Sequence, residues 1–184
     1  MIRTHEHDPR PTIDAVNALD RDGFVALLGG LFEGSPWIAD RTWPARPFAG
    51  RAALHEALCA TMDAASGMEQ VALIRAHPDL VGRAALEGTL TPRSAHEQAS
   101  AGLDHLSSAE VDLFARLNEA YRARFGFPFV ICARLNKKEA IVTGLRSRVA
   151  NTRDGEIHTA LGEIAKISLL RLEDIVAPDK HHDQ

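Results

Sequence analysis

Apolar residues return every three or four positions along most of the chain, which is the spacing of helices with one buried face. Strand-like alternation is rare, and alanine and leucine dominate over β-branched residues. The longest of these apolar faces lies near the C-terminus and consists of Ile157, Leu161, Ile164, Ile167, Leu170 and Leu172. The pattern predicts an all-α fold, a single bundle of about eight helices.

Helix-start and helix-stop residues set the predicted boundaries. Asp20 or Asp22 is suited to cap the second helix, and Gly34 is suited to end it. Ser35 and Pro36 form a helix start, with serine as the N-cap and proline in the first turn. Further predicted helices cover residues 12–19, 50–65, 68–76, 108–125, 137–150 and 154–176.

Two segments interrupt this helical pattern. Residues 43–48 contain two prolines and are predicted to form a loop. Residues 129–133 are the one strongly strand-like run and predict a short extended segment. Ser107 or Ser108 caps the predicted helix over residues 108–125, with Glu110 near the capping-box position.

Length and composition suit one soluble domain over residues 1–184, with flexible ends at residues 1–11 and 177–184. The net charge of −4 gives no basic field for nucleic acid. No run approaches the ~18 apolar residues of a membrane helix. No secretory or peroxisomal signal is visible, so we expect a cytoplasmic protein. Cys59 and Cys132 have apolar neighbours and no metal-type spacing, which indicates buried, reduced thiols.

His77 is the first candidate for chemistry. The following Pro78 ends the helix and restricts the backbone, so the histidine side chain is held in a limited set of directions. An imidazole has an ordinary pKa near 6.5, which suits proton transfer at neutral pH. The alternative is a histidine that only favours the helix dipole and bonds a carbonyl.

A second candidate is the helix face formed by Ser94, Glu97 and Gln98, which are three and four residues apart. A hydroxyl, a carboxylate and an amide there suit a small ligand rich in N–H and C=O groups. The alternative is a capping box, in which Ser94 and Glu97 serve only the backbone. The pair Thr91 and Pro92 offers a competing helix start that would release both side chains.

Backbone groups and arginines supply the remaining candidates. The extended segment presents N–H and C=O groups to a ligand, unless it is an ordinary core strand. Arginine binds carboxylates in a two-pronged geometry, and Arg171, with leucines on either side, is expected to face inward. The other candidates for binding a carboxylate are Arg146, Arg148 and Arg153.

No metal site is predicted. The inner histidines lack zinc-type spacing. The others lie with an aspartate near the two ends of the chain, at His5, His7, Asp8, His181 and His182.

Taken together, the motifs resemble the OHCU decarboxylase family, where OHCU is 2-oxo-4-hydroxy-4-carboxy-5-ureidoimidazoline. The combination of His-Pro-Asp-Leu, Ser-x-x-Glu-Gln and Phe-Gly-Phe-Pro-Phe is specific, whereas each motif alone is weak. The similar segments follow the family's order and cover nearly the whole chain beyond about residue 20. They are residues 32–40, 46–48, 73–80, 90–104, 117–134 and 156–172.

The resemblance implies an all-α, cytoplasmic homodimer without metal or organic cofactor that converts OHCU to (S)-allantoin during uric acid breakdown. It implies His77 as the acid–base group, assisted by Glu97, and Arg171 as the residue that holds the substrate anion, with Arg148 as the alternative. It also implies substrate contacts by Pro78, Ser94, Ala95, His96, Glu97 and Gln98, and by Phe129, Val130, Ile131, Cys132 and Ala133. The competing interpretation is a helical module that binds a purine-like molecule without catalysis.

Overall fold

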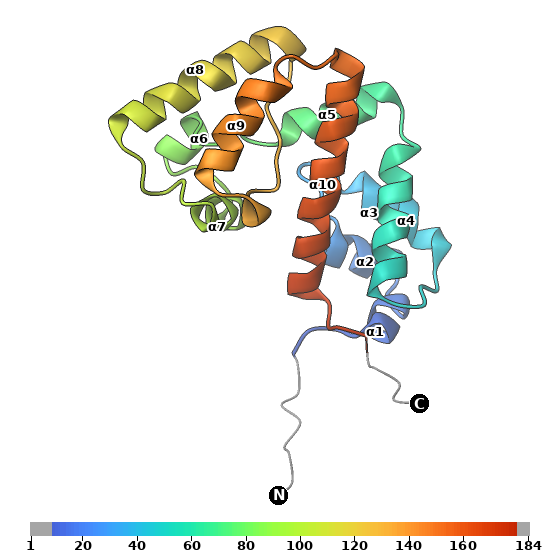
Figure 1. Cartoon of the computed structure of the whole chain (residues 1–184). Helices are drawn as coiled ribbons and strands as arrows, with labels where there is room; N and C mark the ends of the chain where they lie inside the picture. Colours follow the sequence, from blue (N-terminus) through green and yellow to red (C-terminus); the bar gives the residue numbers. More distant parts are fainter. Residues whose placement is uncertain (1–8, 180–184) are drawn as a thin grey trace, which may run out of the picture. The chain divides into compact units, whose positions relative to one another are not determined.

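The structure is a computed structural model that describes residues 9–179, and it is helical throughout (Figure 1). No β-strand occurs within these residues, which confirms the predicted all-α class. The terminal histidines and Asp8 lie outside this range. By their internal contacts the residues fall into two compact units, the first formed by Met1–Ala64 and Ser168–Gln184 and the second by Ala65–Ile167.

The first unit packs short helices around one apolar core. It contains α1 (Ile13–Asn17), α2 (Arg21–Leu28), α3 (Trp37–Thr42), the 3-10 helix η1 (Trp43–Ala45), α4 (Arg51–Asp63) and the end of α10 (Arg153–Ile175). Helix α3 packs against both α2 and α4. The fully buried core side chains include Val16, Phe24, Leu28, Ile38, Leu54 and Leu58.

The inner parts of the predicted flexible ends are held by hydrogen bonds in the first unit. The backbone N–H of Ala177 donates to the carbonyl of Pro11 at 2.9 Å. The N–H of Arg51 donates to the carboxylate of Asp179 at 3.0 Å. Pro11, Ala177 and Asp179, which the sequence predicted to be flexible, are therefore held by hydrogen bonds.

The second unit contains α5 (Gly67–Ala76), α6 (Arg83–Leu86), α7 (Pro92–Ser100), α8 (Ser108–Phe125), η2 (Ala133–Leu135), α9 (Lys138–Arg148) and the beginning of α10 (Figure 1). Its core is aromatic around Tyr121, whose ring lies 4.7 Å from that of Phe125 and 5.3 Å from that of Phe129. Gly126 ends α8 with a φ of 77°, a left-handed conformation that glycine adopts without strain. The turn at Gly126 leads into the extended segment.

Several predicted boundaries are wrong. Helix α2 ends at Leu28, because Gly29 and the glycine after it lack side chains to support another turn. Pro36, not Ser35, is the N-cap of α3, and no side chain caps this helix. The predicted loop at 43–48 begins with η1, since proline is compatible with a first helical turn. Helix α6 was not predicted.

The extended segment is confirmed, but it ends one residue earlier than expected. Residues 128–132 are non-helical and pair with no strand, whereas Ala133 already belongs to η2. The carbonyl of Cys132 accepts a hydrogen bond from the Leu135 N–H at 3.1 Å, which closes this turn. Within the described residues no helix has the length and apolarity needed to cross a membrane.

The structure decides which serine caps α8. Ser107 Oγ accepts from the Glu110 N–H, and the Glu110 carboxylate accepts from the Ser107 N–H at 2.8 Å, which completes a capping box. Ser108 is the first helical residue and is exposed.

We therefore expect Ser107→Ala to lower the free energy of unfolding by about 1 kcal/mol, since one N-cap bond is lost. Ser108→Ala is the matched control and should change this free energy by no more than a few tenths, because alanine is the better helix former. Urea denaturation of both variants measures the difference. Equal losses in the two variants would contradict the assigned cap.

Candidate active site

The end of α5 fixes the position of His77. The helix stops at Ala76, and His77 adopts an extended conformation with φ −74° and ψ 137°, as expected before a proline. Its N–H bonds the carbonyl of Ile74 at 3.2 Å. The carbonyl of Leu73, which would accept this N–H in a continuing helix, lies 2.9 Å from His77 Nδ1 instead.

This contact determines which nitrogen of the neutral ring carries the proton. A carbonyl only accepts, so Nδ1 is the N–H donor and Nε2 carries the lone pair. The side chain of His77 is 7% exposed, and Nε2 itself is buried. The imidazole is therefore oriented to accept and return a proton through Nε2, within the second unit.

The turn after His77 is held by Gln98 of α7. Gln98 Oε1 accepts from the Val81 N–H at 3.0 Å, and Gln98 Nε2 lies 3.4 Å from the Asp79 carbonyl. Val81 has a φ of 53°, which is uncommon for a β-branched residue. Gln98, expected from the resemblance to contact a ligand, thus also holds the His-Pro-Asp-Leu turn.

Helix α8 holds the same turn with two side chains that the sequence analysis missed. Asn118 Nδ2 donates to the Leu80 carbonyl at 2.8 Å. Arg122 Nε lies 2.9 Å from both carboxylate oxygens of Asp79. No local motif marks either residue, because each partner is some forty positions away in the sequence.

Helix α7 begins at Pro92 with Thr91 as its N-cap, which decides against a Ser94–Glu97 capping box. Thr91 Oγ1 accepts from the Ser94 N–H at 3.2 Å, and the Thr91 hydroxyl lies 3.0 Å from Ser94 Oγ. Ser94 is buried and Glu97 is half-buried. The carboxylate of Glu97 is therefore not used by the helix N-terminus.

The α7 face and the extended segment come together in the second unit. Helix α7 packs against η2. Burial raises the pKa of the Cys132 thiol, and the carboxylates of Glu163 and Glu97 raise it further. Cys132 therefore stays a neutral thiol at neutral pH. Ala95 and His96, which the resemblance implies as substrate contacts, are exposed.

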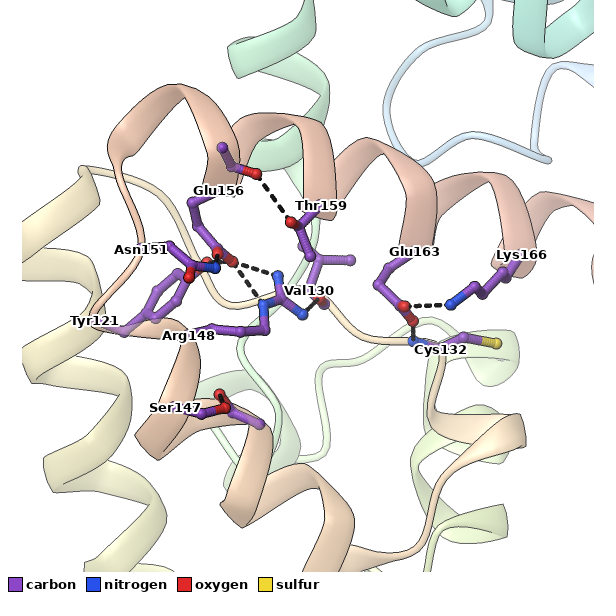
Figure 2. Close-up of polar contacts among 12 residues, drawn as sticks. Tyr121, Val130, Cys132, Ser147, Arg148, Asn151, Glu156, Thr159, Glu163 and Lys166 are labelled. Atoms are coloured by element: carbon purple, nitrogen blue, oxygen red, sulfur yellow. Dashed lines mark hydrogen bonds and ion pairs between the residues drawn. The ribbon is translucent and has the colours of Figure 1, made fainter.

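Arg148 is engaged inside the second unit, as Figure 2 shows. Its Nε lies 2.8 Å from Glu156 Oε1, and its Nη1 donates to the Val130 carbonyl at 2.9 Å. The guanidinium also lies 4.3 Å from the centre of the Phe129 ring. Arg148 therefore connects Glu156 to the extended segment through these contacts.

Arg171 lies in the first unit and is 2% exposed, which confirms that it faces inward. Its Nη1 is 3.1 Å from Glu33 Oε2 and 3.3 Å from the Leu31 carbonyl. A guanidinium has five N–H donors in a fixed plane and is always protonated, and here it is paired with the Glu33 carboxylate.

Sequence comparison decides the family. The family model described as OHCU decarboxylase matches residues 17–173. The chain belongs to the OHCU decarboxylase family.

Individual relatives agree over most of the chain. A 2-oxo-4-hydroxy-4-carboxy-5-ureidoimidazoline decarboxylase of Halalkalicoccus jeotgali is 40% identical, covering 92% of this chain and 94% of the relative. A protein of the same name from Mus musculus is 41% identical, covering 90% and 93%. The crystal structure of an (S)-allantoin synthase is similar with a TM-score of 0.71 at 26% identity, covering 90% of this chain and 54% of that one.

This member of the OHCU decarboxylase family also has a cleft of about 680 Å³ next to the turn that follows His77. Its walls come from residues 79–87 and from α8, and include Val81 and Asn118. None of the predicted site residues lines it. Among the described residues, no three side chains of His, Cys, Asp or Glu gather as a metal ligand set.

The cap of α7 gives a stability test for this OHCU decarboxylase family member. Thr91→Ala should lower the free energy of unfolding by about 0.5–2 kcal/mol, because it removes the N-cap. Glu97→Gln should lower it by less than the loss of this cap, since the Glu97 carboxylate lies outside the N-cap hydrogen bond of α7. Denaturant unfolding measures both, and the reverse order would restore the capping-box interpretation of Ser94 and Glu97.

Proposed function

We propose that the chain decarboxylates OHCU to (S)-allantoin in uric acid breakdown, without a cofactor. The observation that carries this proposal is the buried imidazole of His77, whose Nδ1 is 2.9 Å from the Leu73 carbonyl. The α7 face and the extended segment belong to the same unit. Membership of the family supplies the substrate class.

The substrate explains why no cofactor is required. OHCU carries its carboxylate on a ring carbon next to a C=N group. When the bond to the carboxylate breaks, CO₂ leaves and the electron pair moves toward that C=N group and the ring carbonyl. The ring nitrogen takes up one proton in place of the lost carboxylate. The C4 hydroxyl then loses its proton as it becomes a carbonyl, and one proton is added to C5, the carbon that bears the ureido group. The ring serves as its own electron sink, so the protein has to orient it and deliver the proton.

The proton transfer is assigned to His77. Its Nε2 lone pair accepts a proton and returns it to one face of the planar ring, which sets the (S) configuration. Glu97 orients the ring or shares the proton, and the Ser94 hydroxyl and the Gln98 amide complete the polar face of α7. Proton transfer by a positioned side chain is worth roughly 10²–10⁴ in rate.

The anionic end of the substrate is assigned to Arg171. The support is chemical, because a buried, always protonated fork suits a carboxylate. Arg171 is preferred to Arg148 because of its position in the motif that resembles the family, and Arg148 remains the alternative. The resemblance also supports a cytoplasmic homodimer, which light scattering of the purified chain and cell fractionation test.

The proposal predicts that the wild-type chain makes optically active allantoin from OHCU produced during urate oxidase turnover. His77→Asn should lower this stereoselective rate by about 10²–10⁴ without unfolding the protein, because the proton donor is lost. Circular dichroism during turnover measures the rate, after subtraction of the racemic product of spontaneous decay. His158→Asn, at an exposed position of α10, is the control and should behave as wild type.

Two results would contradict the proposal. Undiminished stereoselective turnover by His77→Asn would remove this residue from the mechanism. A wild-type chain that binds the product but gives no optically active allantoin would favour the non-catalytic binding module.

A further inference from the structure

The extended segment beside α10 is held from one side by two charged side chains (Figure 2). Arg148 Nη1 donates to the Val130 carbonyl at 2.9 Å, and Glu163 Oε2 accepts from the Cys132 N–H at 2.8 Å. In an extended chain, successive residues direct their N–H and C=O groups to opposite sides. The two held groups belong to residues two apart, so they lie on the same side of the segment.

The opposite side belongs to Ile131. Within residues 9–179 its peptide N–H and C=O take part in no hydrogen bond, and the residue is half-exposed. A neighbouring donor and acceptor on one backbone edge match a ligand that carries its own adjacent C=O and N–H groups. The ureide and ring amide groups of OHCU have this character.

The two charged side chains are themselves fixed. Glu156, fully buried, accepts from Arg148, from the Tyr121 hydroxyl and from Asn151 Nδ2, the last at 2.7 Å. Burial and the Glu156 carboxylate raise the pKa of Tyr121, so its hydroxyl keeps its proton and remains a donor.

Glu163 is held in a similar way two turns further along α10. Its side chain is 13% exposed, and Lys166 Nζ lies 2.5 Å from Glu163 Oε1. The oxygen that accepts from Cys132 is the other one, Oε2. The contact with Lys166 and the contact with the segment can therefore be separated by mutation.

We propose that Glu163 and Arg148 are positioning residues of the decarboxylase site, which hold residues 130–132 from behind so that the Ile131 peptide meets the substrate ring. This inference rests on the proposed function. Neither side chain touches the substrate in this account. Their effect is to keep the backbone donor and acceptor in one place, which lowers the entropy lost when the ring binds.

Glu163 gives the sharper experiment, because removal of Arg148 would leave the carboxylate of Glu156 buried without its cation and would destabilise the fold. Glu163→Ala removes the acceptor for the Cys132 N–H, and alanine preserves the helix. Glu163→Gln keeps an acceptor oxygen at the same place. Lys166→Ala is the matched control, since it removes the ion pair and leaves the backbone contact.

We expect Glu163→Ala to raise KM for OHCU about tenfold, as loss of one charge-assisted hydrogen bond would, with kcat changed by no more than about twofold. Glu163→Gln should recover most of this loss, and Lys166→Ala should match wild type. Initial rates of (S)-allantoin formation at several OHCU concentrations, normalised to folded protein, separate KM from kcat. A purely structural role would lower the melting temperature and leave both constants unchanged.

Any of the following results would overturn the inference. A wild-type KM in Glu163→Ala would show that the segment needs no support, and a Glu163→Gln variant as impaired as Glu163→Ala would show that charge, not the backbone bond, matters. If Glu163→Ala does not fold, Arg148→Lys takes its place, because lysine keeps the cation for Glu156 but not the planar fork that also reaches Val130. A wild-type KM there overturns the inference as well. An inactive wild-type chain would instead remove the proposed function, and this inference with it.

Discussion

The contact between His77 Nδ1 and the Leu73 carbonyl is the interaction on which the candidate site depends. It exists because Pro78 makes α5 end at Ala76, so that the Leu73 carbonyl loses its usual N–H partner. The ring takes the place of that N–H at 2.9 Å. The carbonyl of the buried Leu73 thus contributes to the orientation of the imidazole.

Side-chain hydrogen bonds also hold the backbone of two non-helical segments in the second unit. Gln98 and Asn118 bind the backbone of the following turn, and Arg148 and Glu163 bind the backbone of the extended segment. Buried or partly buried polar side chains therefore hydrogen-bond to the backbone of two non-helical segments. A reaction whose substrate accepts its own electrons gains chiefly from such fixed geometry.

The sequence predicted the features that depend on neighbouring residues. The end of α5 before Pro78, the Ser107–Glu110 capping box and the competing start at Thr91 and Pro92 each follow from residues within four positions. The resemblance added the roles of Glu97 and Arg171, which no spacing establishes.

The remaining features depend on packing between distant segments. Asn118 meets the Leu80 carbonyl across 38 positions and Glu163 meets Cys132 across 31, so no local pattern indicates either pair. The early end of α2 at Gly29 was missed because the apolar spacing continues through Leu31 and Phe32, which are buried outside the helix. Burial and helicity coincide in most of this chain, but not there.

The tautomer of His77 tests the central claim most directly. Multiple-bond ¹⁵N–¹H NMR of the neutral protein distinguishes the two ring nitrogens, and the signals that disappear in His77→Asn give the assignment. The account predicts a proton on Nδ1 and a lone pair on Nε2. A ring protonated on Nε2 instead would contradict it, since the Leu73 carbonyl cannot donate a hydrogen bond.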